Sequence, residues 1–183
     1  MKYFDKIAVF DLDDTLYKGN SHIEWLCSYY GTSFFKSLFF RAIGRLAPWL
    51  QRYIIWELYE RVDDKKKKDF ILPFRKPVID ILREKQKEGF HPVIVSNAPL
   101  QLLVNAASVL QIEFLSAKVN NKGKQFTSAY RYDELFVCTD NKTDLDLIMI
   151  ADQAVIPCKK KNCCFFRKRL PQGKYKLLIV EEH

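Results

Sequence analysis

Three aspartates, Asp11, Asp13 and Asp14, follow directly on the apolar run at residues 7–10. Such a run predicts a short buried β-strand, so the carboxylates come at its carboxyl end. Like charges this close repel one another and raise one another's pKa unless a cation or a proton lies between them. In extended backbone alternate side chains share a direction, so Asp11 and Asp13 can converge on one point while Leu12 points away. The stretch therefore predicts a site at the strand end, with a divalent cation as the simplest source of neutralisation.

The composition predicts one ordered globular domain with room for a modest insertion, because 183 residues with 48% hydrophobic side chains suffice for a full core. The net charge of +8 is local. Residues 158–176 contain eight Lys or Arg and no Asp or Glu, which leaves 22 charges of each sign elsewhere. This basic segment predicts either a solvated surface or an anion-binding one. We expect no nucleic-acid partner.

The start of the chain has no apolar stretch long enough for a signal peptide. The cysteines form an odd set without CxxC spacing, which argues against a disulfide framework and against a structural zinc site: Cys27, Cys138, Cys158, Cys163 and Cys164. We therefore expect a cytoplasmic protein with reduced thiols.

Residues 21–70 form an aromatic-rich region with helical periodicity and no strand signal. A membrane-spanning helix is disfavoured here, because several charges and Pro48 interrupt the apolar run. At 100° per residue Arg41, Arg45 and Arg52 fall on one stripe, so an amphipathic helix on a membrane surface is one interpretation. A small packed helical cap is the interpretation that we prefer.

From residue 76 onward strand and helix patterns alternate, which is typical of an α/β sheet. We expect a doubly wound, mostly parallel, Rossmann-like sheet, with residues 1–16 and 74–183 as its core and residues 17–73 as an inserted helical cap. Residues 120–132 have a less regular pattern. The expected strands are 92–96, 114–119, 134–139, 154–157 and 176–180, and the expected helices are 78–88, 100–110 and 143–151.

Polar side chains follow three of the expected strands, and the carboxyl ends of parallel strands meet at one edge of a sheet. These side chains are Asp11, Asp13, Ser96, Asn97, Asp140 and Asp144. Ser96 with Asn97, and Asp140 with Asp144, would each by itself fit an ordinary helix cap. Together, carboxylates that cannot pair with each other face a hydroxyl and helix N-terminal amides that favour an oxyanion. The combination predicts a site for a metal and a phosphate group.

These motifs resemble the haloacid dehalogenase-like hydrolases, and more narrowly their phosphoserine-phosphatase-like branch with a helical C1-type cap. The first family motif, DxDxT, matches residues 11–15; the second, an apolar run that ends in Ser or Thr, matches residues 93–96. The fourth, an acidic pair, matches Asp140 and Asp144. Thr139 stands where the family often has Gly, which predicts local crowding of the backbone.

The resemblance implies roles for four groups. Asp11 is the nucleophile that forms an aspartyl-phosphate, and Asp13 is the general acid and base. Ser96 and Asn97 bind the phosphate. For the lysine of the third motif, which neutralises phosphate and nucleophile, spacing favours Lys124 and then Lys122.

The resemblance also implies a magnesium site. Its ligands are the Asp11 carboxylate, the Asp13 backbone carbonyl, Asp140 and water, with Asp144 bound directly or through water. Hard oxygen donors suit Mg²⁺, and the absence of His and Cys from the motifs argues against zinc.

The leading hypothesis is a cytoplasmic, Mg²⁺-dependent phosphatase that acts on a small phosphorylated metabolite. Two alternatives stay open: a phosphate-binding protein with a decayed catalytic site, and a membrane-peripheral phosphatase acting on a lipid phosphate. The sequence leaves the substrate and the oligomeric state open.

Overall fold

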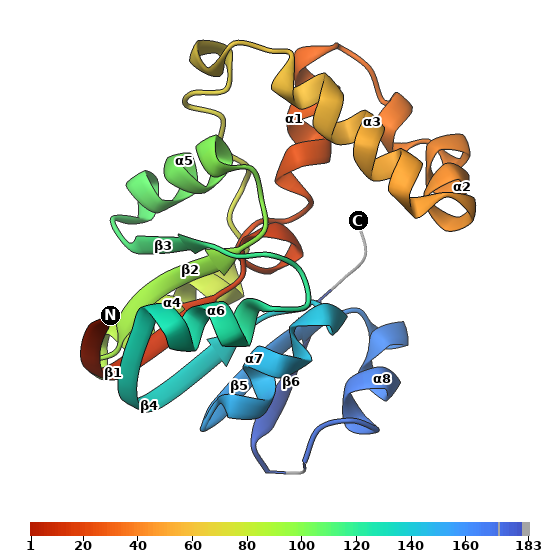
Figure 1. The fold of residues 1–183 in the computed structure, drawn as a ribbon. Coiled ribbons are helices and arrows are strands. Elements are labelled where there is room, and N and C mark those ends of the chain that lie inside the picture. The colour runs from red at the N-terminus through yellow and green to blue at the C-terminus, as the bar shows by residue number, and fades with distance from the viewer. Residues whose placement is uncertain (172, 181–183) are drawn as a thin grey trace.

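The chain folds around a six-stranded parallel sheet of order β3-β2-β1-β4-β5-β6 (Figure 1). The computed structural model describes residues 1–171 and 173–180. Residue 172 of the basic segment and the last three residues of the expected core therefore lie outside the described residues. The strands are β1 (Lys2–Phe10), β2 (His91–Ser96), β3 (Glu113–Ser116), β4 (Tyr130–Cys138), β5 (Gln153–Cys158) and β6 (Tyr175–Ile179).

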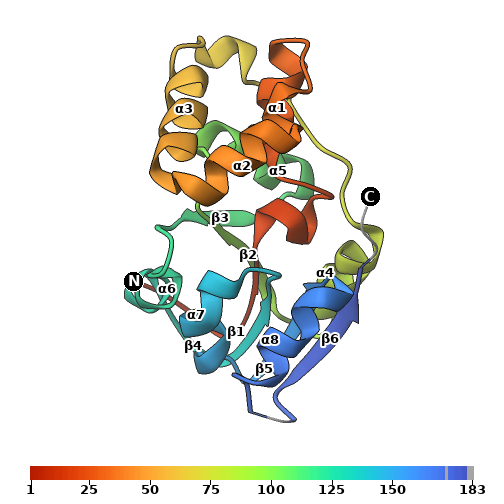
Figure 2. The same ribbon diagram turned by 90° about the vertical axis from the view of Figure 1, so that its right-hand side faces the viewer.

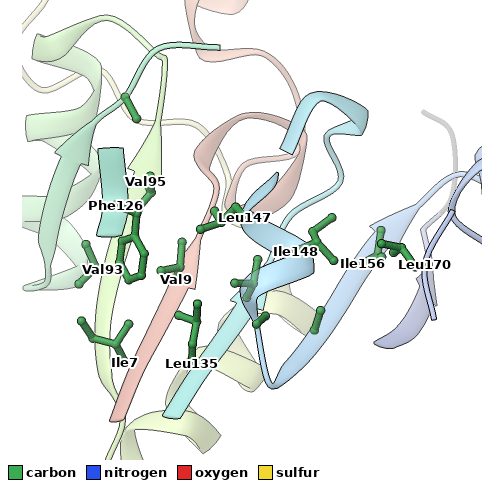
Figure 3. Packing of buried hydrophobic residues seen from close by; sticks show 14 of the residues in the cluster. Ile7, Val9, Val93, Val95, Phe126, Leu135, Leu147, Ile148, Ile156 and Leu170 are labelled. Atoms are coloured by element: carbon green, nitrogen blue, oxygen red, sulfur yellow. The ribbon is translucent and has the colours of Figure 1, made fainter. Parts of the chain in front are cut away.

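Helices cover both faces of the sheet, as the predicted doubly wound class requires. Along β1 the side chains alternate: Ile7 and Val9 pack in one apolar cluster, and Ala8 and Phe10 pack in another. Figure 3 shows the first cluster, in which Phe126 lies against the central strands. The helices α6 (Lys122–Ala129), α7 (Leu145–Ile150) and α8 (Cys163–Arg167) contribute to this cluster, and α4 (Lys76–Lys87) and α5 (Leu100–Leu110) to the other. The predicted fold class is confirmed.

The strand order reverses beside β1. β2 and β3 follow on one side of this strand, and the chain then crosses to β4, β5 and β6 on the other. The amide of Asp11 donates to the carbonyl of Cys138 at 2.9 Å, so the carboxyl ends of β1 and β4 stay together beyond the paired residues. Such a reversal leaves a crevice at the carboxyl ends of the strands, where ligands bind in open α/β sheets.

We call residues 17–73 the cap segment. It contains the helices α1 (Ser21–Tyr29), α2 (Leu38–Leu46) and α3 (Pro48–Glu60). These helices lie together on one side of the sheet in both views (Figures 1 and 2). They share an apolar cluster that includes Trp25, Phe40 and Tyr59, and Leu102 of α5 joins it. The division into a catalytic core and a cap stays a prediction.

The expected arginine stripe does not lie on one helix. α2 ends at Leu46 and α3 begins at Pro48, because proline has no backbone N–H to donate inside a helix but is suited to a first turn. Arg41 and Arg45 therefore belong to α2, and Arg52 belongs to α3. Within the described part of the chain, no helix combines the length and apolar character needed to cross a membrane.

The stretch expected to be irregular, residues 120–132, instead contains α6 and the start of β4. Because most residues of α6 are polar, the sequence shows no clear apolar periodicity there. The hydroxyl of Thr127 donates to the carbonyl of Gly123 at 3.1 Å, and that of Ser128 donates to the carbonyl of Lys124 at 2.8 Å. These side chains bond back onto carbonyls of their own helix; Ser and Thr are neutral to unfavourable inside helices, which is why the helical pattern was weak in the sequence.

Candidate active site

A tight turn carries the chain out of β1. The amide of Leu16 donates to the carbonyl of Asp11 at 3.3 Å, and the amide of Tyr17 donates to that of Leu12 at 2.9 Å. Asp14 has φ = 55°, a left-handed conformation that Asp tolerates better than most residues. The turn keeps Asp11 buried at the strand end and places Asp13 beside the start of α1.

A lysine occupies the centre of the site, and it is Lys122 rather than Lys124. The Lys122 Nζ donates to Asp11 Oδ1 at 2.8 Å and to Asp144 Oδ2 at 2.7 Å, and the side chain is fully buried. Burial alone lowers the pKa of a lysine, but the charges of Asp11 and Asp144 outweigh it and raise the pKa of Lys122. Lys124 is exposed two residues farther along α6. The structure thus corrects the order of preference that spacing alone suggested.

Gly123 holds the first turn of α6 against α7. Its amide donates to Asp146 Oδ2 at 2.8 Å, and a Cβ at this position would lie 3.0 Å from the Asp146 backbone. A side chain here would push the two helices slightly apart, so glycine suits this close approach next to Lys122. The glycine directly after Lys122 can be seen in the sequence. That it allows close packing of α6 on α7 can be recognised only from the structure.

The carboxylate of Asp144 bonds to Lys122, and its predicted role as a metal ligand, bound directly or through water, stays a prediction. Besides Lys122, Asp144 Oδ2 accepts from the Thr139 hydroxyl at 2.8 Å, and the side chain is fully buried. Thr139 was expected to crowd the backbone. It is not among the described residues with positive φ, and its hydroxyl positions Asp144.

Asp13 lies at the N-terminal end of α1. Its Oδ1 accepts from the backbone amide of Ser21 at 2.8 Å, and its Oδ2 accepts from Asn20 Nδ2 at 3.1 Å. Burial raises the pKa of Asp13 to about 7, although the bonds from Ser21 oppose the shift and the charge of Asp11 adds to it. Asp13 can therefore hold a proton near neutral pH and still release it.

Asp140 follows β4 and faces the turn after β1. The Thr15 hydroxyl donates to Asp140 Oδ1 at 3.0 Å and accepts from the Asp140 amide at 3.0 Å. Burial, together with the negative charges of Asp11 and Asp14, raises the pKa of Asp140 to about 8. The DxDxT motif contains Thr15, but the sequence did not indicate that this hydroxyl links the two strand ends.

The raised pKa values of Asp13 and Asp140 come first from burial and then from the charges of the neighbouring aspartates, and a bound cation would oppose both effects. Among residues 1–171 and 173–180, no three His, Cys, Asp or Glu side chains are placed to hold one ion together. An ion bound by the carboxylates of Asp11 and Asp140, a backbone carbonyl and water fits this arrangement. Mg²⁺ is commonly held by one or two carboxylates and keeps several waters. The donor set therefore suits this cation.

Ser96 and Asn97 follow β2 and precede α5. The Ser96 side chain is buried, and its hydroxyl oxygen accepts from the amide of Ala98 at 3.4 Å. Asn97 is exposed and lines a cleft beside Asp13. β2 pairs with β1, with Ile94 opposite Phe10. Ser96, the last residue of β2, therefore lies beside the turn that carries the aspartates.

The basic segment reaches the same edge of the sheet. Lys159 and Lys161 line a small cavity of about 190 Å³ together with Asp14, Arg75 and Asp140. The Arg75 guanidinium donates to the carbonyl of Asp14 at 3.2 Å. This part of the segment supplies positive charge beside the aspartates.

A larger cleft of about 660 Å³ lies between the turn after β1, the residues after β2 and the cap segment. Asp13, Asn20 and Asn97 line it near the ends of β1 and β2, and His22 lines it from α1. His22 is only 9% exposed, and its Nε2 has no partner within the described residues. Burial lowers the pKa of His22 to about 4.

The lowered pKa of His22 predicts that the stability of the protein depends on pH. Folded His22 stays neutral, while unfolded His22 takes up a proton below its ordinary value of 6.5, so its contribution to stability is present above pH 6.5 and is lost toward pH 4. The difference in free energy of unfolding between wild type and His22→Gln should therefore fall by up to about 3 kcal/mol over this range. Urea unfolding at several pH values measures it, and a difference that does not change with pH would contradict it.

No protein-family model and no curated protein matches the sequence. A structure of a protein with unknown function from Bordetella pertussis Tohama I superimposes with a TM-score of 0.59 and 13% identity, covering 97% of this chain and 98% of that one. A phosphoserine phosphatase in apo form superimposes with a TM-score of 0.61 and 13% identity, covering 84% and 86%. These likenesses confirm the fold that the resemblance to the haloacid dehalogenase-like hydrolases implies, the parallel α/β fold of a phosphoserine phosphatase.

Proposed function

We propose that the protein is a Mg²⁺-dependent phosphatase that cleaves a phosphomonoester through an aspartyl-phosphate. One observation carries the proposal: buried Asp11 lies at the end of the central strand with Oδ1 held by Lys122 at 2.8 Å. Among the described residues, its Oδ2 has no hydrogen-bond partner. A carboxylate that is oriented by a cation and has one free oxygen is arranged as a nucleophile.

The residues divide the reaction into two steps. Asp11 attacks phosphorus, and the bond to the leaving oxygen breaks while Asp13 gives that oxygen its proton. Asp13, now ionised, takes a proton from water, which attacks the phosphorus of the aspartyl-phosphate and regenerates the Asp11 carboxylate. The pKa of Asp13, about 7, supports both halves of this role.

Lys122 offsets negative charge on the phosphoryl group, and the hydroxyl of Ser96 and the amides before α5 supply hydrogen bonds to its oxygens. Asp11, Asp140 and the backbone carbonyl of Asp13 would hold Mg²⁺. When bound, this cation neutralises the carboxylates and the phosphoryl oxygens.

The test is release of inorganic phosphate from a panel of phosphomonoesters, with Mg²⁺ and with a chelator. We expect turnover that depends on Mg²⁺, and we expect Asp140→Asn to raise the Mg²⁺ concentration for half-maximal activity by at least about tenfold, because it removes a charged ligand. Asp133→Asn, an exposed change on β4, the strand that Asp140 follows, is the matched control.

The same variants can be tested without turnover. Mg²⁺ should raise the melting temperature of the wild type and of Asp133→Asn but raise that of Asp140→Asn much less, since an ion that binds the folded state stabilises it by an amount that increases with its affinity. Phosphate binding without hydrolysis of any ester would contradict the proposal and favour the alternative of a decayed site.

A further inference from the structure

The cleft beside Asp13 has a wall formed by large aromatic side chains of α3. Trp49, Tyr53 and Trp56 line it, and they are 69%, 60% and 50% exposed. Spacings of four and three residues put them on one face of the helix. Aromatic side chains left in water forgo a large burial energy, which a ligand that covers them would supply.

The lining of the cleft also includes two polar side chains, His22 and Arg52. The Nε2 of buried His22 is unpartnered among the described residues, and His22 follows Ser21, whose amide donates to Asp13. Arg52 shares the exposed face of α3, and its Nε donates to the carbonyl of Pro48 at 3.3 Å. Apolar walls with a few polar groups are typical of sites for organic ligands, and such sites have volumes of about 300–1,000 Å³.

The cleft is continuous with the catalytic residues, because Asp13 and Asn97 belong to its lining. Asp13 is the group that gives a proton to the leaving oxygen in the proposed reaction. Whatever carries that oxygen must therefore extend from Asp13 into the space bounded by α3.

We propose that this cleft binds the leaving group and that the substrates are phosphomonoesters with a bulky, apolar leaving group; the proposal rests on the proposed phosphatase function. A small polar alcohol such as serine would leave Trp49 and Trp56 in water and most of the 660 Å³ unfilled. An aryl group or a long alkyl chain would cover them, and these two sources share the same apolar chemistry.

The test compares matched pairs of substrates, so that the intrinsic reactivity of the leaving group is nearly constant within each pair. Naphthyl phosphate is compared with phenyl phosphate, and decyl phosphate with ethyl phosphate. We expect kcat/KM to be higher by about tenfold or more for the larger member of at least one pair, and the pair that shows it identifies the aryl or alkyl source. Equal values within both pairs would overturn the proposal.

Variants locate the effect on α3. Trp49→Ala and Trp56→Ala should each lower the preference for the larger substrate by about tenfold. Their effect on kcat/KM for ethyl phosphate should be smaller, because an ethyl group covers less of the aromatic wall. Phe39→Ala is the matched control, because Phe39 is a 67% exposed aromatic side chain of α2 that is not part of the cleft lining. An equal fall for large and small substrates would contradict a role in leaving-group binding.

Binding separates this proposal from the proposed function. Calorimetry on Asp11→Asn, in which turnover is blocked, should give a lower Kd for naphthyl than for phenyl phosphate, or for decyl than for ethyl phosphate. If no ester is hydrolysed with Mg²⁺ but this difference is found, the phosphatase mechanism fails and the apolar binding site stands. If esters are hydrolysed and no difference is found in rate or in binding, the phosphatase stands and the apolar site fails.

Discussion

Asp11→Asn is expected to lower kcat for phosphate release by at least about 10³-fold, because the amide cannot form the aspartyl-phosphate. The fold should survive. Asn keeps the oxygen that accepts from Lys122 Nζ at 2.8 Å, and its shape is almost that of Asp. The change also removes one of several like charges at the strand ends, so the free energy of unfolding of the metal-free protein should change by no more than about 1 kcal/mol.

Steady-state kinetics and urea unfolding measure the two expectations separately. Asp5→Asn is the matched control, because Asp5 lies on the same strand but is exposed. This control should change neither kcat nor stability by a measurable amount. If Asp11→Asn kept near wild-type kcat while folded, another residue would have to be the nucleophile.

The sheet could be predicted from the sequence because its signals are local. The apolar runs at residues 7–10 and 92–96 are short and are followed by polar side chains, and parallel strands place such ends at one edge. Helix α5 was predicted with the bounds that the structure shows, Leu100–Leu110. Asp11 and Ser96 could thus be assigned to the ends of β1 and β2 from the sequence alone.

The lysine could not be assigned in this way, because its position depends on tertiary packing. Lys122 and Lys124 are two residues apart, and the packing of Gly123 on Asp146 and the bonds of Lys122 to Asp11 and Asp144 are tertiary contacts that the local sequence does not show. The role of Asp144 also depends on these contacts. The sequence indicated a metal ligand, which stays a prediction, but it could not show that the carboxylate also accepts from Lys122 and Thr139.

The break between α2 and α3 is caused locally by Pro48, but the direction of α3 after the break depends on tertiary packing. Pro48 was visible in the sequence as an interruption, and it begins a new helix. The direction that α3 takes from there is set by its packing in the cluster of the cap segment. The sequence could therefore place a boundary near residue 48, but it could not show that Trp49 and Trp56 line a cleft beside Asp13.

Lys122→Met is expected to be the most destabilising of the substitutions considered. Methionine fills a similar volume, but it leaves Asp11 and Asp144 buried without their cation. Removing one partner of a buried ion pair costs roughly 3–5 kcal/mol. Activity should fall by about 10²–10³-fold in the fraction that stays folded, which is typical of the loss of one group that stabilises a developing negative charge.

A double variant tests the cause of this loss. If the cost comes from uncompensated carboxylates, Lys122→Met combined with Asp144→Asn should be more stable than Lys122→Met alone, because it removes one of the two buried charges. Kinetic activity should stay low, since the cation beside Asp11 is still absent. A double variant less stable than both single variants would show that Lys122 acts through packing rather than through charge.

Lys124→Met is the matched control, and it also decides between the two lysines. Lys124 is exposed on the same helix, so its replacement should change the free energy of unfolding by less than about 0.5 kcal/mol and leave kcat unchanged. Urea unfolding and phosphate release, measured on both variants under the same conditions, provide the comparison. A large loss of activity in Lys124→Met, with Lys122→Met active, would restore the assignment that spacing favoured and would remove the buried cation from the mechanism.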